Sequence, residues 1–202
     1  MKTENIKDIM ELNFGEKEEY LESEYASITE ISINRFNVVG DIVPIDFNEL
    51  LYFTNLHNLI IKQCIIDKDI FDIILKLINL KNLYIDDCEV VDDISILFEN
   101  KKFDTLIFDN INFDISELEK INSNNLYIYN TTLTEDLNLN VLKLDISNCE
   151  IKENIHINCS ALETLVINSS MYNNINKEIN NFHGHLIVME ENGQFIKEER
   201  DV

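Results

Sequence analysis

The residues best suited to chemistry in this chain are its four cysteines and four histidines. His183 and His185 flank Gly184, and two imidazoles at such spacing can supply two ligands to a metal ion. No third ligand stands at metal-site spacing beside them, and no two cysteines form a C-x-x-C pair. Cys159 follows His156 by three residues, whereas a cysteine nucleophile takes its histidine from a distant part of the chain. We therefore expect neither a metal site nor cysteine catalysis.

Pairs of adjacent aspartates are the next candidates. Asp86-Asp87 and Asp92-Asp93 could be drawn as a calcium site, but the spacing of an EF-hand loop is absent. The sequence also contains no glycine-rich phosphate loop, no G-x-S-x-G elbow and no H-E-x-x-H motif. We interpret the aspartates as solvated faces, and we expect a protein that is not an enzyme and uses no cofactor.

A recurring apolar pattern organises the chain. Residues 80–90 read L-x-x-L-x-I-x-x-C-x-V, and similar sets recur at intervals of 18 to 28 residues. The sets begin at Ile28, Leu56, Leu80, Phe103, Ser123, Val141, Leu162 and His183. Cys64, Cys88 and Cys149 share one position of the pattern, which predicts that they stack as buried thiols.

This pattern, over residues ~28 to ~190, resembles the leucine-rich repeat family, most closely its cysteine-containing and ribonuclease-inhibitor-like types. The resemblance implies an α/β fold: a right-handed solenoid with a parallel β-sheet on the concave face and short helices and irregular segments on the convex face. The ninth position departs from the family's asparagine or cysteine at Phe36, Ile111, Thr131 and Ser170.

The segments between the expected strands predict how each repeat closes. Helices are expected over 47–55, 69–79, 93–100 and 114–121, and Asp69 is the N-cap candidate of the second. The later repeats are shorter, so we expect their return segments to be extended or to form a single turn.

Both ends of the chain differ from the repeats. Residues 1–24 contain a helix candidate with Ile6, Ile9 and Met10 on one face, Thr3 as a cap and Gly15 as a stop. We interpret 1–24 as an acidic cap, or alternatively an interaction arm, and 25–182 as the repeats. In 183–202, Asn192-Gly193 between two apolar runs predicts a capping hairpin.

Residues between the core positions are expected to face solvent on the concave side. Tyr84 and its equivalents would form a stripe of tyrosine, isoleucine and valine with an acidic rim, which is typical of a protein interface. The alternative is that such residues are good strand formers. The predicted partner-binding residues are Ile60, Tyr84, Asp86, Asp87, Ile107, Asp109, Tyr127, Tyr129, Asp145 and Val166.

The charge balance narrows the possible partners. The formal net charge is −22 and the isoelectric point is near 4.3, which opposes binding to nucleic acid or to anionic membranes. The negative charge favours solubility. With equal weight, it favours fast association with a basic protein. The first residues lack the apolar run of a signal peptide, so we expect a protein of the reduced cytoplasm, monomeric apart from its partner.

Together these observations predict a protein-binding module. The most concrete hypothesis is an acidic inhibitor, such as an immunity protein that neutralises a basic nuclease toxin through its concave face. The alternative is a leucine-rich repeat scaffold or regulatory adaptor that binds a peptide or a helix.

Overall fold

The computed structural model describes most of the 202-residue chain. The described residues are 6–34, 46–112, 114–152, 155–175, 182, 184–190 and 195–200, with the backbone alone at 115, 173–175 and 195–200. Of the residues on which sequence-based expectations fall, Thr3, Phe36, His183 and Asn192-Gly193 lie outside this set.

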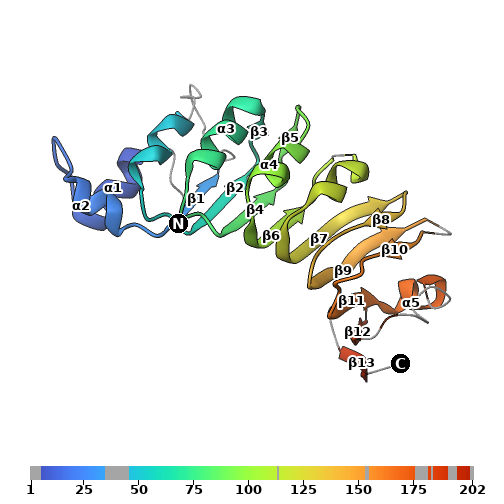
Figure 1. The fold of residues 1–202 in the computed structure, drawn as a ribbon. Helices are drawn as coiled ribbons and strands as arrows, with labels where there is room; N and C mark the ends of the chain where they lie inside the picture. Colours follow the sequence, from blue (N-terminus) through green and yellow to red (C-terminus); the bar gives the residue numbers. More distant parts are fainter. Residues whose placement is uncertain are drawn as a thin grey trace.

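One large β-sheet dominates the molecule, and its strands follow the order of the chain (Figure 1). Eight strands are parallel, and the ninth pairs antiparallel with the eighth. The fold is therefore of the α/β class, as predicted. In order, the strands are β1 (Glu30–Asn34), β2 (Asn58–Lys62), β4 (Asn82–Asp86), β6 (Phe103–Asp109), β7 (Ser123–Leu133), β9 (Lys143–Ile151), β11 (Thr164–Asn168), β12 (His185–Met189) and β13 (Phe195–Arg200).

The recurring apolar pattern sets the register of this sheet. Leu83 on β4 lies opposite Leu59 on β2 and Leu106 on β6, and the same match continues along the sheet. Ile85 and Phe108, two residues further along their strands, are also paired and fully buried. Side chains alternate between the two faces of a strand, so these positions place one face of every parallel strand in a continuous apolar core.

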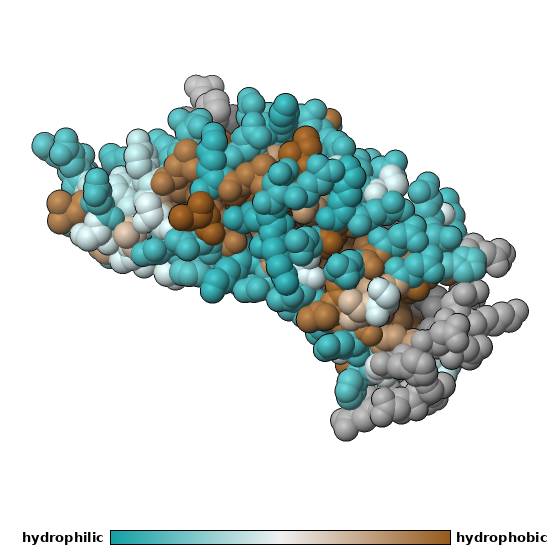
Figure 2. All heavy atoms as spheres, in the orientation of Figure 1, coloured by the Kyte–Doolittle hydropathy of each residue, from teal (hydrophilic) through white to brown (hydrophobic). Residues whose placement is uncertain are grey.

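Short helices cover that apolar face. They are η1 (Phe47–Tyr52), α3 (Lys68–Lys76), α4 (Ser95–Asn100) and η2 (Ile115–Lys120), close to the four predicted ranges. Figure 1 shows the main sheet along the inner side of a bend, with α3 and α4 on the outer side. Hydrophilic residues cover most of the view in Figure 2, and hydrophobic residues show in patches near these helices.

The N-cap of α3 corrects one prediction. Asp67, rather than Asp69, caps the helix, because its carboxylate accepts a hydrogen bond of 3.1 Å from the backbone N–H of Ile70. An N-cap side chain reaches the N–H three residues ahead, and only Asp67 stands at that distance from Ile70. Asp69 lies within the first turn, where its charge still favours the helix dipole.

The later return segments are extended in two cases and helical in the third. β8 (Leu137–Asn138) pairs with β10 (Ile157–Asn158), as β3 (Ile65–Ile66) pairs with β5 (Glu89–Val90) earlier in the chain. α5 (Ser169–Ile175) is seven residues long, so the expected single turn is wrong there. The buried Asn168 explains the difference, because its side-chain oxygen accepts a 2.8 Å hydrogen bond from Met171 N and starts the helix.

The two ends of the sheet carry the predicted elements. α1 (Ile6–Phe14) buries Ile6, Ile9 and Met10 in the same apolar core as the strands. It ends at Phe14, directly before Gly15, whose φ of +78° suits a glycine, and α2 (Glu22–Ser27) follows. At the other end, β12 and β13 form the expected antiparallel pair. Within the described part of the chain, no helix has the length and hydropathy to cross a bilayer.

Candidate functional site: the open face of the sheet

The face of the parallel sheet opposite the apolar core carries the predicted binding residues, and we call it the open face. Its central row runs in direct register across all eight parallel strands. The predicted equivalence of Tyr84 with Ile60, Ile107, Tyr127, Asp145 and Val166 is therefore confirmed. The row consists of Ser32, Ile60, Tyr84, Ile107, Tyr127, Asp145, Val166 and Ile187.

Exposure differs along the central row. Ile60, Tyr84, Ile107 and Tyr127 are half-buried, on four consecutive strands, and each presents part of an apolar side chain to solvent. Adjacent strands lie about 4.8 Å apart, so these four side chains span about 15 Å. We call them the apolar stripe.

Two predicted members do not face solvent. Asp145 is 9% exposed and Val166 is 6% exposed, so our expectation of solvent-facing side chains there is wrong. Asp145 is buried on this face, where its carboxylate accepts hydrogen bonds from the N–H and hydroxyl of Ser147, at 3.1 and 2.7 Å. Val166 lies in register between Asp145 and Ile187.

Tyr84 is held in place by charged neighbours from three strands. Its hydroxyl donates a 3.0 Å hydrogen bond to Asp109, and the ammonium of Lys62 lies 4.9 Å from the centre of its ring. Lys62 in turn pairs with Asp86 at 2.6 Å. Burial first, and then the hydrogen bond to Asp109, raises the pKa of Tyr84 well above its ordinary value. The phenol therefore stays neutral at physiological pH, and the ring stands in a fixed orientation.

Tyr127 and Tyr129 form a second aromatic group. Their ring centres are 6.1 Å apart, and the ammonium of Lys143 lies 4.9 Å from the Tyr127 ring. The Tyr129 hydroxyl donates to Asp145 at 3.3 Å. Burial, followed by the charge of Asp145, raises the pKa of Tyr129. Both aromatic groups thus combine a fixed tyrosine with a lysine above a ring, an arrangement stabilised by cation–π attraction.

A ladder of polar side chains borders the stripe where the strands end. Gln63, Asp87, Asn110 and Asn130 occupy equivalent positions, and all four have φ between 51° and 55°. Asp87 accepts hydrogen bonds from Gln63 at 3.1 Å and from Asn110 at 2.6 Å. Gln63, Asp87 and Asn110 directly follow the ends of β2, β4 and β6, whereas Asn130 lies within β7; asparagine and aspartate tolerate this left-handed conformation better than most residues. Asn130, which our site prediction omitted, donates to Asp109 at 2.6 Å; the repetition of a polar residue at this position could have revealed it.

The rows of the open face carry only a small part of the negative charge of the chain, although the predicted rim residues Asp86 and Asp109 lie in them and Asp87 borders them. The charged residues of these rows are Glu30, Asp86, Asp109 and Asp145, with Lys62 and Lys143, so their formal charge is −2 of the total −22. The other residues of the two flanking rows are Asn58, Asn82, Thr105, Asn125, Thr164 and His185 on one side, and Asn34, Tyr129, Asn148, Asn168 and Met189 on the other. Most of the negative charge therefore lies elsewhere.

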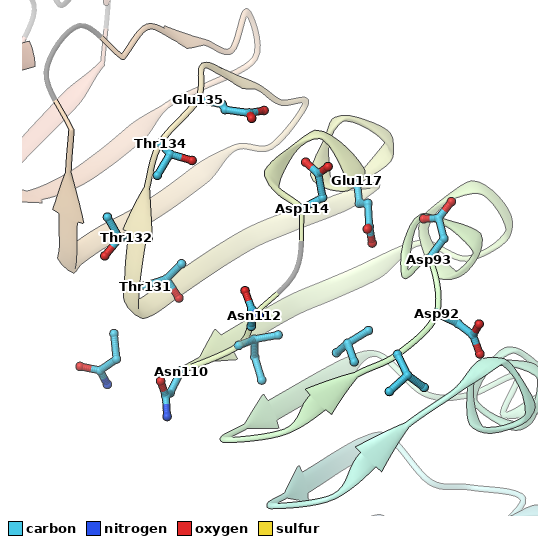
Figure 3. A pocket seen from close by; sticks show the side chains of 14 residues that line it. Asp92, Asp93, Asn110, Asn112, Asp114, Glu117, Thr131, Thr132, Thr134 and Glu135 are labelled. Atoms are coloured by element: carbon cyan, nitrogen blue, oxygen red, sulfur yellow. The ribbon is translucent and has the colours of Figure 1, made fainter.

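An acidic groove beyond the strand ends holds part of that charge (Figure 3). It has a volume of about 760 Å³, and Asp92, Asp93, Asp114, Glu117 and Glu135 are among its lining residues. Three of these carboxylates already accept hydrogen bonds from backbone N–H groups. Asp93 accepts from Ser95 N at 2.8 Å, Asp114 from Ser116 N at 3.0 Å, and Glu117 from Ile94 N at 2.9 Å.

Hydrogen bonding and burial shift the pKa values of the acids in this groove in opposite directions. Bonds to Ser95 lower the pKa of Asp93, and bonds to Ser116 lower that of Asp114, whereas burial raises the pKa of Glu117. Among the described residues, no three histidine, cysteine or acidic side chains are arranged to hold a metal ion. The groove is therefore built mainly from helix-capping and loop-bridging carboxylates.

Three of the four cysteines are buried, and His156 lies beside an acidic side chain. Cys64, Cys88 and Cys149 are buried as predicted, and the Cys64 N–H lies 3.4 Å from the Cys88 sulfur. Cys159 is only partly buried, and its thiol donates to Val141 O at 3.3 Å. The His156 imidazole lies 3.3 Å from Asp136 in an exposed position.

We expect the Cys149 thiol to be inert in the folded protein. Burial raises its pKa to about 12, so the thiolate at pH 8 amounts to about one molecule in ten thousand. Peptide mass spectrometry after iodoacetamide treatment at pH 8 should find Cys149 unmodified in native protein and fully modified in urea. Equal labelling rates in the two conditions would show that this site is accessible.

No protein-family model and no curated protein matches the chain. What the open face can bind follows from its own geometry and charge: a fixed aromatic and aliphatic surface, bordered by amides and by carboxylates that already hold hydrogen bonds.

Proposed function

We propose that this chain is a leucine-rich-repeat-like solenoid that binds another protein through the open face. The observation that carries the proposal is the apolar stripe: Ile60, Tyr84, Ile107 and Tyr127 stand in register on four adjacent strands, on the face that no helix covers among the described residues. Strands that advance in chain order, with equivalent residues in register, support the solenoid. The bend seen in Figure 1 supports a concave open face.

The stripe has the physical character of a binding hot spot. Aromatic side chains with few rotatable bonds lose little entropy on binding, and Tyr84 and Tyr129 are further fixed by hydrogen bonds to Asp109 and Asp145. Strand residues on a continuous sheet also resist movement. A partner would therefore meet a surface that is already in its binding conformation. The proposed role is binding without catalysis or a cofactor.

The charge of the whole chain and the charge of the open face affect different steps of binding. With a net charge of −22, the whole molecule steers a basic protein toward it. The open face carries only −2, so the contact itself would be mainly apolar and aromatic, with a polar border. We propose a partner that has an exposed apolar patch within a basic surface, rather than nucleic acid or a membrane.

An inhibitor of a basic enzyme, such as an immunity protein against a nuclease toxin, remains the concrete form of this proposal. A nuclease surface is basic because it binds phosphates, and overall charge would hasten the encounter of the two proteins. The nearly neutral open face favours the second candidate, a scaffold or adaptor that binds a peptide or a helix. An assay of the partner's activity, free and bound, separates the two functions.

The test compares two isoleucine-to-glutamate variants. Ile107 lies in the apolar stripe, and Ile65, 49% exposed on β3, lies outside the open face. Tagged wild type and Ile65→Glu should capture the same protein from a native lysate of the source cells, less at high salt than at low salt, whereas Ile107→Glu should capture none. Capture that survives Ile107→Glu but is lost in Ile65→Glu would contradict the proposal.

A further inference from the structure

A second concave site lies at the N-terminal end of the molecule, away from the apolar stripe. It is a cavity of about 350 Å³, within the size range of small-ligand pockets. Three tyrosines line it, from the loop between α1 and α2, from α2 and from η1. The lining consists of Ile6, Lys7, Lys17, Glu18, Glu19, Tyr20, Tyr25, Glu49 and Tyr52.

The three tyrosine rings are arranged around one another. Tyr25 stands at the centre, with the ring of Tyr20 6.2 Å away at an interplanar angle of 81° and that of Tyr52 5.5 Å away at 43°. Tyr25 also packs edge-on against the buried Phe53 at 5.4 Å, and the Tyr20 hydroxyl donates to Gly15 O at 3.0 Å. Core packing and a backbone hydrogen bond therefore fix two of the rings, while Tyr52 is 61% exposed.

The charges around these rings favour a cation. Lys7 pairs with Glu11, and Lys17 pairs with Glu24; neither glutamate belongs to the lining. This leaves Glu18, Glu19 and Glu49 as lining carboxylates with no ion pair among the described residues. Glu49 lines the same cavity as the central ring of Tyr25, and burial, followed by the charge of Glu49, raises the pKa of Tyr25.

We infer that this cavity binds an organic ammonium cation against Tyr20, Tyr25 and Tyr52, with Glu49 as its counter-charge. Aromatic faces carry negative potential, and several of them around a desolvated cation attract it more strongly than a single ring does. The chain itself contains one such cation–ring contact, because the ammonium of Lys17 lies 5.9 Å from the Tyr20 ring centre. The cation can be a free quaternary ammonium compound or the lysine side chain of a partner protein.

Titrations of the full chain with three probes test this site and distinguish the two sources. The probes are choline, its neutral isostere 3,3-dimethylbutan-1-ol, and Nα-acetyl-lysine methylamide, each followed by NMR of protein labelled in its seven tyrosine rings. Choline or the lysine derivative should shift three tyrosine signals, and the neutral isostere should not. A stronger response to choline indicates a free quaternary ammonium ligand, and a stronger response to the lysine derivative indicates a protein side chain.

Two variants at Tyr52 test the contribution of the ring. Tyr52→Leu should weaken binding of the cationic probe by about tenfold, and Tyr52→Phe should restore it to within about twofold. Because Tyr52 is mostly exposed, both variants should keep the fold, which circular dichroism checks. Equal responses to choline and its neutral isostere, no response to either cation, or unchanged binding in Tyr52→Leu would each overturn the inference.

Discussion

Replacing Phe108 by alanine should lower the free energy of unfolding by about 3 to 5 kcal/mol, whereas Ile107→Ala, one residue away, should lower it by about 1 kcal/mol. Phe108 is fully buried and meets the ring of Phe98 edge-on, with 6.1 Å between ring centres and an angle of 73°. Truncation there removes apolar contacts and leaves a cavity. Ile107 points to the open face, where water can replace the lost methyl groups.

Urea unfolding followed by circular dichroism measures both values. The two positions lie on the same strand with the same backbone environment, so each serves as the control for the other. Equal losses, or a larger loss for Ile107→Ala, would mean that the inward and outward faces of β6 have been assigned the wrong way round.

The second large effect concerns affinity for the partner. Tyr84→Ala with Tyr127→Ala should weaken binding by about 4 kcal/mol, near a thousandfold, because each removes a fixed aromatic anchor worth about 2 kcal/mol. The same double variant should lose only about 2 kcal/mol of stability, since Tyr84 gives up one hydrogen bond to Asp109 and both rings lose a lysine contact. Isothermal titration with the captured partner measures the affinity.

Phenylalanine variants provide the matched control for this measurement. Tyr84→Phe with Tyr127→Phe keeps both rings and removes only the hydroxyls, so affinity should stay within about tenfold of wild type. If the alanine and phenylalanine variants lose affinity equally, the hydroxyls rather than the rings carry the contact. If neither loses affinity, the apolar stripe is not the binding surface.

The sheet could be predicted nearly residue by residue because one short pattern recurs. A leucine followed two positions later by another large apolar residue forces both side chains to the same face. The register of Tyr84 with Ile60 and Ile107 follows from that alternation. The buried cysteines follow for the same reason, since they occupy one position of the same pattern.

The electrostatic character of the open face could not be predicted in this way. A formal charge counts acidic residues and does not place them, and many of the carboxylates lie in the N-terminal segment and in the groove beyond the strand ends. The burial of Asp145 depends on hydrogen bonds with Ser147 and Tyr129, beside a register shift between β7 and β9. An apolar pattern carries no information about such a shift.

The N-cap residue of α3 also could not be predicted from the apolar pattern. Asp67 and Asp69 are both acceptable N-cap residues by type, and the choice depends on which one leaves the helical conformation. The structure has Asp67 in an extended conformation, with φ of −117° and ψ of −178°. Tertiary packing of Ile70 and Phe71 sets that starting point, because both side chains must reach the core.

The most direct test of binding through the open face is site-specific photo-crosslinking. The photoreactive residue p-benzoyl-L-phenylalanine is placed at position 107 in one variant and at position 65 in a second, and each variant is irradiated in native lysate. Binding through the open face predicts a covalent adduct to one partner from position 107, and none from position 65. An adduct from position 65 alone would contradict it, and would move the binding surface to the region around β3 and β5.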